Sequence, residues 1–345
     1  MLSAYLKGQA MSMISSSTHL ATPDDFSDNC GFGLIAHIEG QASHDLVKTA
    51  IHSLSCMTHR GGVAADGKTG DGCGLLLATP SVFFSNIAAE QGFTLTANFA
   101  VGMVFVNLDE TKAQYSRQVL NEELSAQGLE VAGWRDVPLD LSIVGEIGRE
   151  TLPGFQQVFV NAADELAADD FNRKLFVARK KAEQRLVDDE LFYVCSLNCQ
   201  TIIYKGLVMP SDLPAFFLDL QDTRLASHIV VFHQRFSTNT LPRWPLAQPF
   251  RYLAHNGELN TITGNRSWSE ARTPKLKSDK LPNLNELTPL VNSTGSDSSS
   301  LDNMLEVLMS GGMSLFHSMS ILVPPAWQNV DCMDMDLRAV YEFYS

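Results

Sequence analysis

The chain has 345 residues, of which 45% are hydrophobic and 19% are charged, a composition typical of a globular protein with one large domain or two smaller ones. The formal net charge of −14 disfavours nucleic acid as a partner, because phosphate binding needs clustered Lys and Arg. No apolar run reaches about 18 residues, so we expect no membrane span.

The cysteines and the N-terminal residues indicate a reducing compartment. Six cysteines are scattered, without a Cys-x-x-Cys pair, along a chain longer than a secreted disulfide scaffold, so we expect a cytoplasmic location. Cys195 and Cys199 stand in an alternating pattern, which makes them strand residues and not metal ligands. Residues 1–29 are polar and lack the apolar segment of a secretory signal, so we interpret them as a leader or propeptide that ends at Cys30.

Apolar spacing with a period of two predicts strands, and a period of 3.6 predicts helices. In chain order the expected elements are a strand at 31–38, a helix at 41–57, strands at 74–78 and 99–106, a helix from Asp109 to Gly128, a helix at 163–187, strands at 191–197, 200–205, 228–238 and 250–262, a loop from Thr273 to Thr288, and a helix at 301–309.

Turn and cap residues support this order. Gly61 and Gly62 are expected to end the first helix, and Asp109 to cap the second. Asn256-Gly257 is a tight-turn signal within the expected strand 250–262. Strands that cluster in hairpins, without βα alternation, predict an α+β class with mainly antiparallel sheets.

Cys30 is the candidate nucleophile. Three downstream segments supply what a thiol needs to attack an amide, namely 233–238, 255–260 and 295–299. If the bond between Asn29 and Cys30 is cut, Cys30 gains a free amine with a pKa of about 7.7–8.0. That amine takes the thiol proton and later protonates the leaving ammonia, so no histidine base is required.

The other candidates each have a plainer interpretation when taken alone. Asn256 and Gly257 fit an oxyanion hole, but an isolated Asn-Gly pair is usually a hairpin turn. Arg235 has the planar fork suited to a substrate α-carboxylate, but it could form a structural ion pair. Asp297 could accept a substrate α-ammonium or could simply cap the helix that follows it. The four segments gain weight jointly, because their roles are complementary.

Together these segments resemble the glutaminase domain of class II (N-terminal nucleophile) glutamine amidotransferases. Within that family they are most similar to the large subunit of glutamate synthase. Further segments carry this resemblance: Asp66 to Gly72, Val177 to Lys180, Thr201 to Gly206, Ala247 to Arg251, Gly264 to Arg266 and Ser296 to Asn303.

The resemblance implies a fold and a set of residue roles. The fold is the N-terminal nucleophile hydrolase αββα sandwich with two mainly antiparallel sheets. The catalytic residues are Cys30, Asn256 and Gly257. The substrate-binding group is Arg235, Asp297, Arg60 and His255, in which Arg60 braces the surroundings of the nucleophile and His255 has a hydrogen-bonding role. His59, beside Arg60, could be a core histidine.

The resemblance also implies an activity and partners. Residues 30–345 would form the glutaminase domain, shortened at its C-terminal end relative to the full enzyme. It would hydrolyse L-glutamine through a Cys30 thioester, and the ammonia would serve reductive amination of 2-oxoglutarate elsewhere. FMN and an iron–sulfur cluster are expected in a flavin (synthase) domain outside this chain, with a small electron-donating subunit as a further partner. The alternative is an unprocessed, inert fragment that binds glutamine.

The sequence does not fit a calcium-binding loop or a metal-dependent hydrolase. A calcium loop starting at Asp66 would need a carboxylate or amide at Lys68 and a Glu at Leu77, and neither is present. No His-Glu-x-x-His spacing indicates a metallohydrolase. We therefore predict no metal site and no cofactor in this chain.

Overall fold

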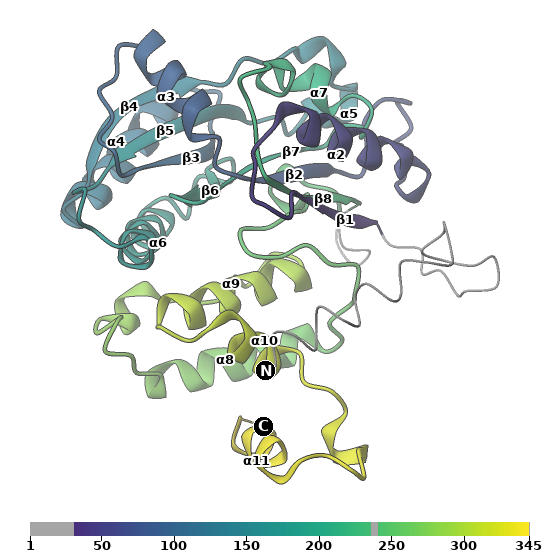
Figure 1. Cartoon of the computed structure of the whole chain (residues 1–345), viewed down its shortest axis with the longest axis vertical. Helices are drawn as coiled ribbons and strands as arrows, with labels where there is room; N and C mark the ends of the chain where they lie inside the picture. The colour runs from purple at the N-terminus through teal and green to yellow at the C-terminus, as the bar shows by residue number, and fades with distance from the viewer. Residues whose placement is uncertain (1–30, 236–240, 345) are drawn as a thin grey trace. The chain divides into compact units, whose positions relative to one another are not determined.

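Two antiparallel sheets organise the part of the chain that the computed structural model describes, residues 31–235 and 241–344. The first sheet has the order β1-β8-β2-β7 and the second the order β4-β5-β3-β6 (Figure 1). The strands are β1 (Phe32–Ala36), β2 (Cys73–Ala78), β3 (Phe99–Val106), β4 (Glu130–Asp136), β5 (Gly154–Asn161), β6 (Tyr193–Asn198), β7 (Thr201–Gly206) and β8 (Ile229–Gln234).

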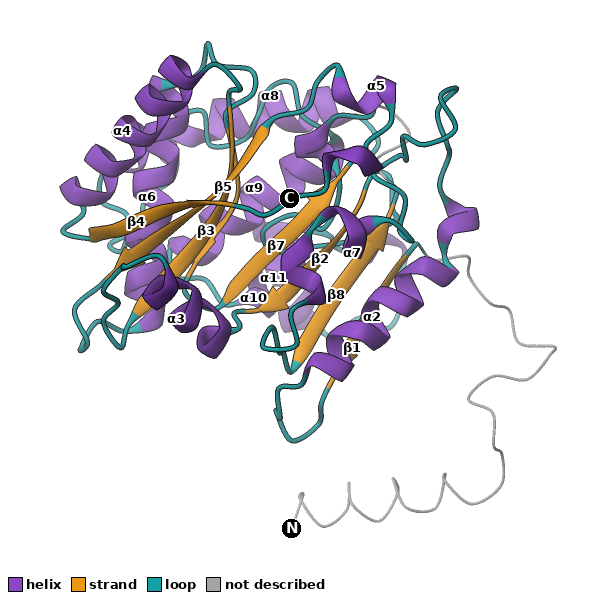
Figure 2. Cartoon of the chain, turned by 90° about the horizontal axis from the view of Figure 1, so that it is seen from above, coloured by secondary structure: helices purple, strands orange, loops and turns teal. Residues whose placement is uncertain are grey.

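Helices lie on both sides of the strands. Figures 1 and 2 show α2, α3 and α7 on one side and α6 and α9 on the other. The helices are α2 (His44–Cys56), α3 (Ser81–Glu90), α4 (Glu110–Ala126), α5 (Glu146–Arg149), α6 (Ala168–Arg185), α7 (Leu213–Phe216), α8 (Ile262–Arg272), α9 (Asp297–Ser310), α10 (Leu315–Leu322) and α11 (Met335–Tyr344).

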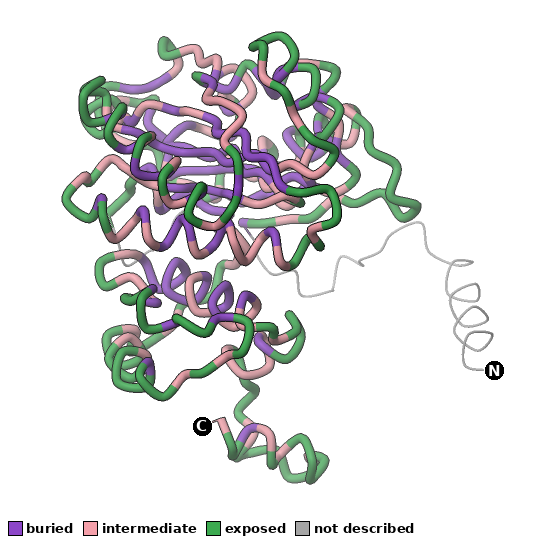
Figure 3. Tube along the Cα trace, turned by 90° about the vertical axis from the view of Figure 1, so that its left-hand side faces the viewer, coloured by how far each residue is buried: buried purple, intermediate pink, exposed green. Residues whose placement is uncertain are grey.

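The alternation of β3 explains why helices cover both sides. Val101, Met103 and Phe105 point into a large core shared with α2, α3 and α7, and the intervening Ala100 and Val104 point into a second core under α4 and α6. Figure 3 shows the strands as the most continuously buried part of the chain. The predicted class, α+β with two antiparallel sheets covered by helices on both sides, is confirmed.

Most of the predicted elements are found. The caps of α4 are as expected, because the Asp109 carboxylate accepts two backbone N–H bonds and Gly128 has the left-handed φ of 72° that suits glycine after a helix. The first helix ends earlier than predicted, at Cys56, and a 3-10 turn, Thr58–Arg60, separates it from Gly61.

The predicted strand at 250–262 is wrong, and Asn256-Gly257 is not a hairpin turn. This segment has no strand assignment, and α8 begins at Ile262. Its backbone donors bond to side chains of other segments instead of to a neighbouring strand. The bonds are Tyr252 N to Asp302, His255 N to Gln248 and Leu259 N to Asp297.

Several elements carry no clear periodic signal and were not predicted. Among them are α3, β4, β5 and α8. Helix α9 is longer than the predicted 301–309 because its first turn buries serines, which apolar periodicity ignores. Their hydroxyls are satisfied locally, as when Ser299 Oγ donates to Ser296 O at 2.8 Å.

A buried polar network joins the two sheets. Arg135 of β4 donates twice to the Asp219 carboxylate, at 2.6 and 2.9 Å, and once to Gln157 of β5 at 2.7 Å. Tyr204 of β7 donates to the same carboxylate at 2.9 Å and accepts from Gln157 at 3.1 Å. Asp219 is 3% exposed, so its charge depends on these partners.

We expect Asp219→Ala to lower the free energy of unfolding by about 3–5 kcal/mol, because it leaves the Arg135 charge buried without its partner. Glu90→Ala is the matched control: it breaks the exposed pair with Arg224 and should cost at most about 1 kcal/mol. Urea unfolding of both variants measures the difference. Equal, small losses would contradict a structural role for the network.

Candidate active site

The candidate site lies where β1 begins and β8 ends. Cys30 is outside the described residues, but its neighbour Gly31 is placed by β8, because Gln234 N donates to Gly31 O at 2.6 Å. The antiparallel register continues with Phe32 opposite His233. The pairing therefore brings the residue that follows Cys30 to the end of β8, beside Arg235.

Asn256 reaches the same place from a distant part of the chain. A Cβ atom added at Gly31 would lie 3.2 Å from Asn256 Oδ1 and 2.7 Å from Gln234 O. Glycine at position 31 thus allows the Asn256 side chain to approach the backbone next to Cys30. Asn256 and Gly257 are both exposed, so their polar groups are open to a ligand.

Buried polar side chains hold the backbone just before Asn256. Gln248, 2% exposed, forms a two-way clamp on His255: its Nε2 donates to His255 O at 3.2 Å and its Oε1 accepts from His255 N at 3.1 Å. The ring of His233 on β8 makes a further contact with His255 O, Nε2 to O 3.0 Å. The backbone of His255 is thereby tied to β8.

Burial favours the uncharged form of both histidines. Burial is the main cause that lowers the pKa of His233 to about 4. Burial also lowers the pKa of His255, opposed by the nearby carboxylate of Asp297. Among the described residues, His255 Nε2 is buried without a hydrogen-bond partner, so it is a polar atom that a ligand can satisfy.

Arg235 sits in an unusual backbone conformation. Its φ is +87°, a region that residues other than glycine rarely adopt, and its N–H donates to Gly72 O at 2.9 Å. Residues other than glycine keep a positive φ only where surrounding contacts impose this conformation, and such positions cluster at functional sites. The side chain is exposed beside the start of β1.

Asp297 faces the site from the first turn of α9. Ser296, not Asp297, is the N-cap of this helix, since Ser296 Oγ accepts from Ser299 N. The Asp297 carboxylate accepts from Leu259 N at 2.9 Å and from Ser298 N at 2.7 Å. It therefore links the Asn256 segment to α9, while a carboxylate retains further acceptor positions.

The loop that carries Arg60 packs against the end of β8. A Cβ at Gly61 would lie 1.9 Å from Gln234 Nε2, so a larger residue there would displace the end of the Gln234 side chain. Gly62 N donates to Asp71 Oδ2 at 2.5 Å, which joins this loop to the next one. Arg60 is half-buried. His59 is exposed, so the core-histidine interpretation is wrong.

The structure thus gathers the segments of Arg60, Arg235, Asn256, Gly257, His255 and Asp297 around the start of β1. Sequence reasoning missed Gln248 and His233 as supporting residues. A polar Gln within Ala247-Gln248-Pro249-Phe250-Arg251 and a His in the apolar strand β8 were the available signals. Neither reveals its partner, because both contact the separate segment at His255.

Nothing in the described residues points to a metal. No group of three or more His, Cys, Asp or Glu residues among them could hold a metal ion. Cys73 is fully buried, and burial raises the pKa of its thiol. The described helices include none long and apolar enough to cross a membrane.

Comparisons with known proteins extend the interpretation. The family model described as glutamine amidotransferases class-II matches residues 30–345. The chain is 42% identical over 321 residues to ferredoxin-dependent glutamate synthase 1 of Arabidopsis thaliana. The aligned residues make up 91% of this chain and 20% of the relative. It is 40% identical over 329 residues to the NADPH glutamate synthase large chain of Bacillus subtilis, with coverage of 94% and 22%.

The chain spans about a fifth of the length of these glutamate synthases. The similarity nevertheless runs along nearly all of this chain, and the matched family region begins at Cys30. These findings and the fold agree that the chain belongs to the class II glutamine amidotransferases, a family of enzymes.

Proposed function

We propose that this chain carries out the glutaminase half-reaction, the hydrolysis of L-glutamine to glutamate and ammonia, with Cys30 as the nucleophile. The observation that supports it most is the convergence of Asn256 and Arg235 on Gly31, the residue next to Cys30. We further propose that residues 1–29 are removed, so that Cys30 becomes the N-terminus. Its free amine, with a pKa of about 7.7–8.0, then acts as the base.

The proposed reaction has two steps. The Cys30 thiol gives its proton to the amine, and the thiolate attacks the side-chain carbonyl of glutamine. The C–N bond breaks, ammonia leaves with a proton from the amine, and a thioester remains. Water then attacks the thioester and releases glutamate.

Asn256 and Gly257 are proposed to stabilise the developing oxyanion. A side-chain amide and a backbone N–H can converge on one oxygen, and each such donor contributes about 100- to 1000-fold in rate. Their position depends on the clamp that Gln248 and His233 place on His255. These two supporting residues should therefore affect the rate without contacting substrate.

The amino-acid end of glutamine is proposed to bind between Arg235 and Asp297. The Arg235 guanidinium would take the α-carboxylate and the Asp297 carboxylate the α-ammonium. His255 Nε2, buried without a partner among the described residues, is a further polar contact for this end of the substrate. Arg60 would brace the nucleophile's surroundings from its half-buried position.

The names of the relatives suggest the wider reaction. We propose that the chain supplies ammonia for glutamate synthesis, as part of a glutamate synthase large chain. The reductive amination of 2-oxoglutarate, with FMN and an iron–sulfur cluster, would take place in regions that this chain does not contain. The electron donor, by analogy with the relatives, would be ferredoxin or NADPH, and a cytoplasmic location stays our prediction.

The nucleophile is tested by intact mass after incubation with a glutamine-like electrophile. We expect a mass that begins at Cys30 and carries one adduct, which the Cys30→Ala variant lacks. Cys56 and Cys332 are exposed thiols, so peptide mapping of both samples supplies the background. A full-length mass without a Cys30 adduct would instead favour an inert, glutamine-binding fragment.

The clamp is tested by Gln248→Ala, with Asn256→Ala as the benchmark. Loss of the clamp lets the oxyanion donor shift, and a displacement of about 1 Å can cost about 100-fold in kcat. We expect a fall in kcat that approaches the benchmark, with a smaller change in KM. Gln221→Ala, which alters an exposed glutamine, is the control. A lower melting temperature with kcat unchanged would show that Gln248 is only structural.

Acid should destabilise the site through His233. The unfolded histidine binds a proton below about pH 6.5, whereas the folded one does so only near pH 4. Because the unfolded state binds more protons in this window, stability is present above pH 6.5 and falls by up to about 3 kcal/mol as the pH drops towards 4.

His233→Gln isolates this effect, since Gln retains a donor for His255 O but does not titrate. Urea unfolding of both proteins between pH 4 and 8 gives the difference. Other groups with shifted pKa values, such as Asp302, whose pKa burial raises to about 6, are common to both and cancel. Identical pH dependence in the two proteins would disprove the assignment to His233.

A further inference from the structure

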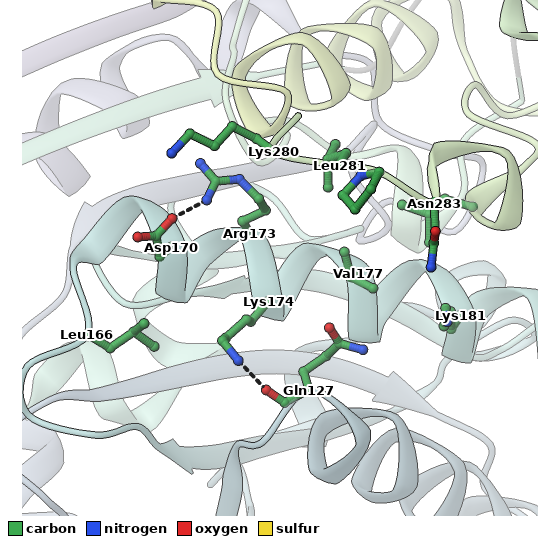
Figure 4. A pocket seen from close by; sticks show the side chains of 12 residues that line it. Gln127, Leu166, Asp170, Arg173, Lys174, Val177, Lys181, Lys280, Leu281 and Asn283 are labelled. Atoms are coloured by element: carbon green, nitrogen blue, oxygen red, sulfur yellow. Dashed lines mark hydrogen bonds and ion pairs between the residues drawn. The ribbon is translucent and has the colours of Figure 1, made fainter. Parts of the chain in front are cut away.

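A second hollow lies away from the candidate active site. It has a volume of about 420 Å³, within the range of small-molecule pockets. One wall is helix α6 and the other is the segment from Lys280 to Leu287 (Figure 4). None of the site residues described above lines it.

The lining is strongly cationic for a chain of this charge. Arg173, Lys174, Lys181 and Lys280 line the pocket, against a single carboxylate from Asp170. Four of the 25 Lys and Arg residues of a chain with net charge −14 thus gather around one cavity. In a concave, partly desolvated site such a group attracts anions more strongly than the same charges on an open surface.

Arg173 and Lys174 each have N–H groups that their present hydrogen bonds do not use. Lys174 Nζ donates to Gln127 O at 2.5 Å, and Arg173 bonds to Ser310 O at 2.8 Å and to Asp170. An ammonium has three donors and a guanidinium five, so each retains further N–H groups. Figure 4 shows the Lys280 and Arg173 head groups on the same side of the pocket.

The other two cations, Lys181 and Lys280, can turn to a ligand at little cost. Lys181 pairs with Glu286 at 3.1 Å, and Glu286 is 55% exposed, so this ion pair is worth little and a stronger anion can displace it. Lys280 is exposed and belongs to the loop wall. Between the charges lie apolar side chains, including Leu166, Val177 and Leu281, which can contact the body of an organic ligand.

We propose that this pocket binds a small organic polyanion, a molecule with two or more phosphate or carboxylate groups. Arg173 and Lys280 would bind one anionic group from one side, and Lys174 and Lys181 another along α6. The apolar residues would contact the carbon skeleton. Lys180, the neighbour of Lys181, donates to Pro289 O at 2.6 Å, just beyond the segment from Lys280 to Leu287. A ligand in the pocket would further join α6 to this part of the chain.

The test is calorimetric titration of the chain with ATP without magnesium, citrate and inorganic pyrophosphate at about 0.15 M ionic strength. We expect at least one probe to bind with a Kd below about 1 mM. Preference for ATP over pyrophosphate would show that the organic body contributes, and preference for citrate would identify a carboxylate ligand. The double variant Lys181→Glu/Lys280→Glu should weaken that binding at least about tenfold.

Lys275→Glu/Lys277→Glu is the matched control. It makes the same charge change at two exposed lysines in the preceding segment that do not line the pocket. Binding lost only in the pocket variant, with unchanged melting temperatures, supports the proposal. Equal weakening in both variants would indicate general electrostatic attraction and overturn it, as would the absence of binding by all three probes. Should the pocket variant unfold, Lys280→Gln provides the same comparison with one exposed side chain.

Discussion

The antiparallel pairing of β1 with β8 is the constraint on which the candidate site depends. Its register places Gly31 opposite Gln234, which sets the start of β1 beside Arg235. A slip of one residue would turn every side chain of β1 to the opposite face of the sheet. The pairing is stabilised because β8 lies between β1 and β2 in the sheet and because α2 packs on β1 and β8.

The second half of the site depends on polar contacts instead of on a sheet. The segment that carries Asn256 has no strand partner and is held by Gln248, His233 and Asp297, each of which bonds to its backbone. Earlier in this segment, the largely buried side chain of Arg251 bonds to Glu306 and to Val194 O, which ties the segment to α9 and β6. Buried polar groups of this kind are costly unless fully satisfied, so they specify one arrangement of the segment.

Charge is distributed unevenly over this acidic protein. Some of its cations form buried ion pairs, such as Arg135 with Asp219 and Arg179 with Glu306, and four others line the cavity along α6. In that cavity the lining cations outnumber the lining carboxylates, and its volume of about 420 Å³ is large enough for a ligand. Away from the candidate active site, the protein thus presents a second, chemically different recess.

The sequence alone determined the elements with strong periodicity and the family to which the chain belongs. Strands such as β3, helices such as α4 with its Asp109 cap, and the α+β class follow from apolar spacing and local caps, which depend on near neighbours. The candidate residues followed from the residue types and the order of four segments. Only the tertiary structure decided that residues 250–262 are not a strand, that Ser296 caps α9, and that Gln248 and His233 support the site. The physical reason is that the backbone groups of this segment are satisfied by side chains from distant parts of the chain, and no local pattern records such long-range hydrogen bonds.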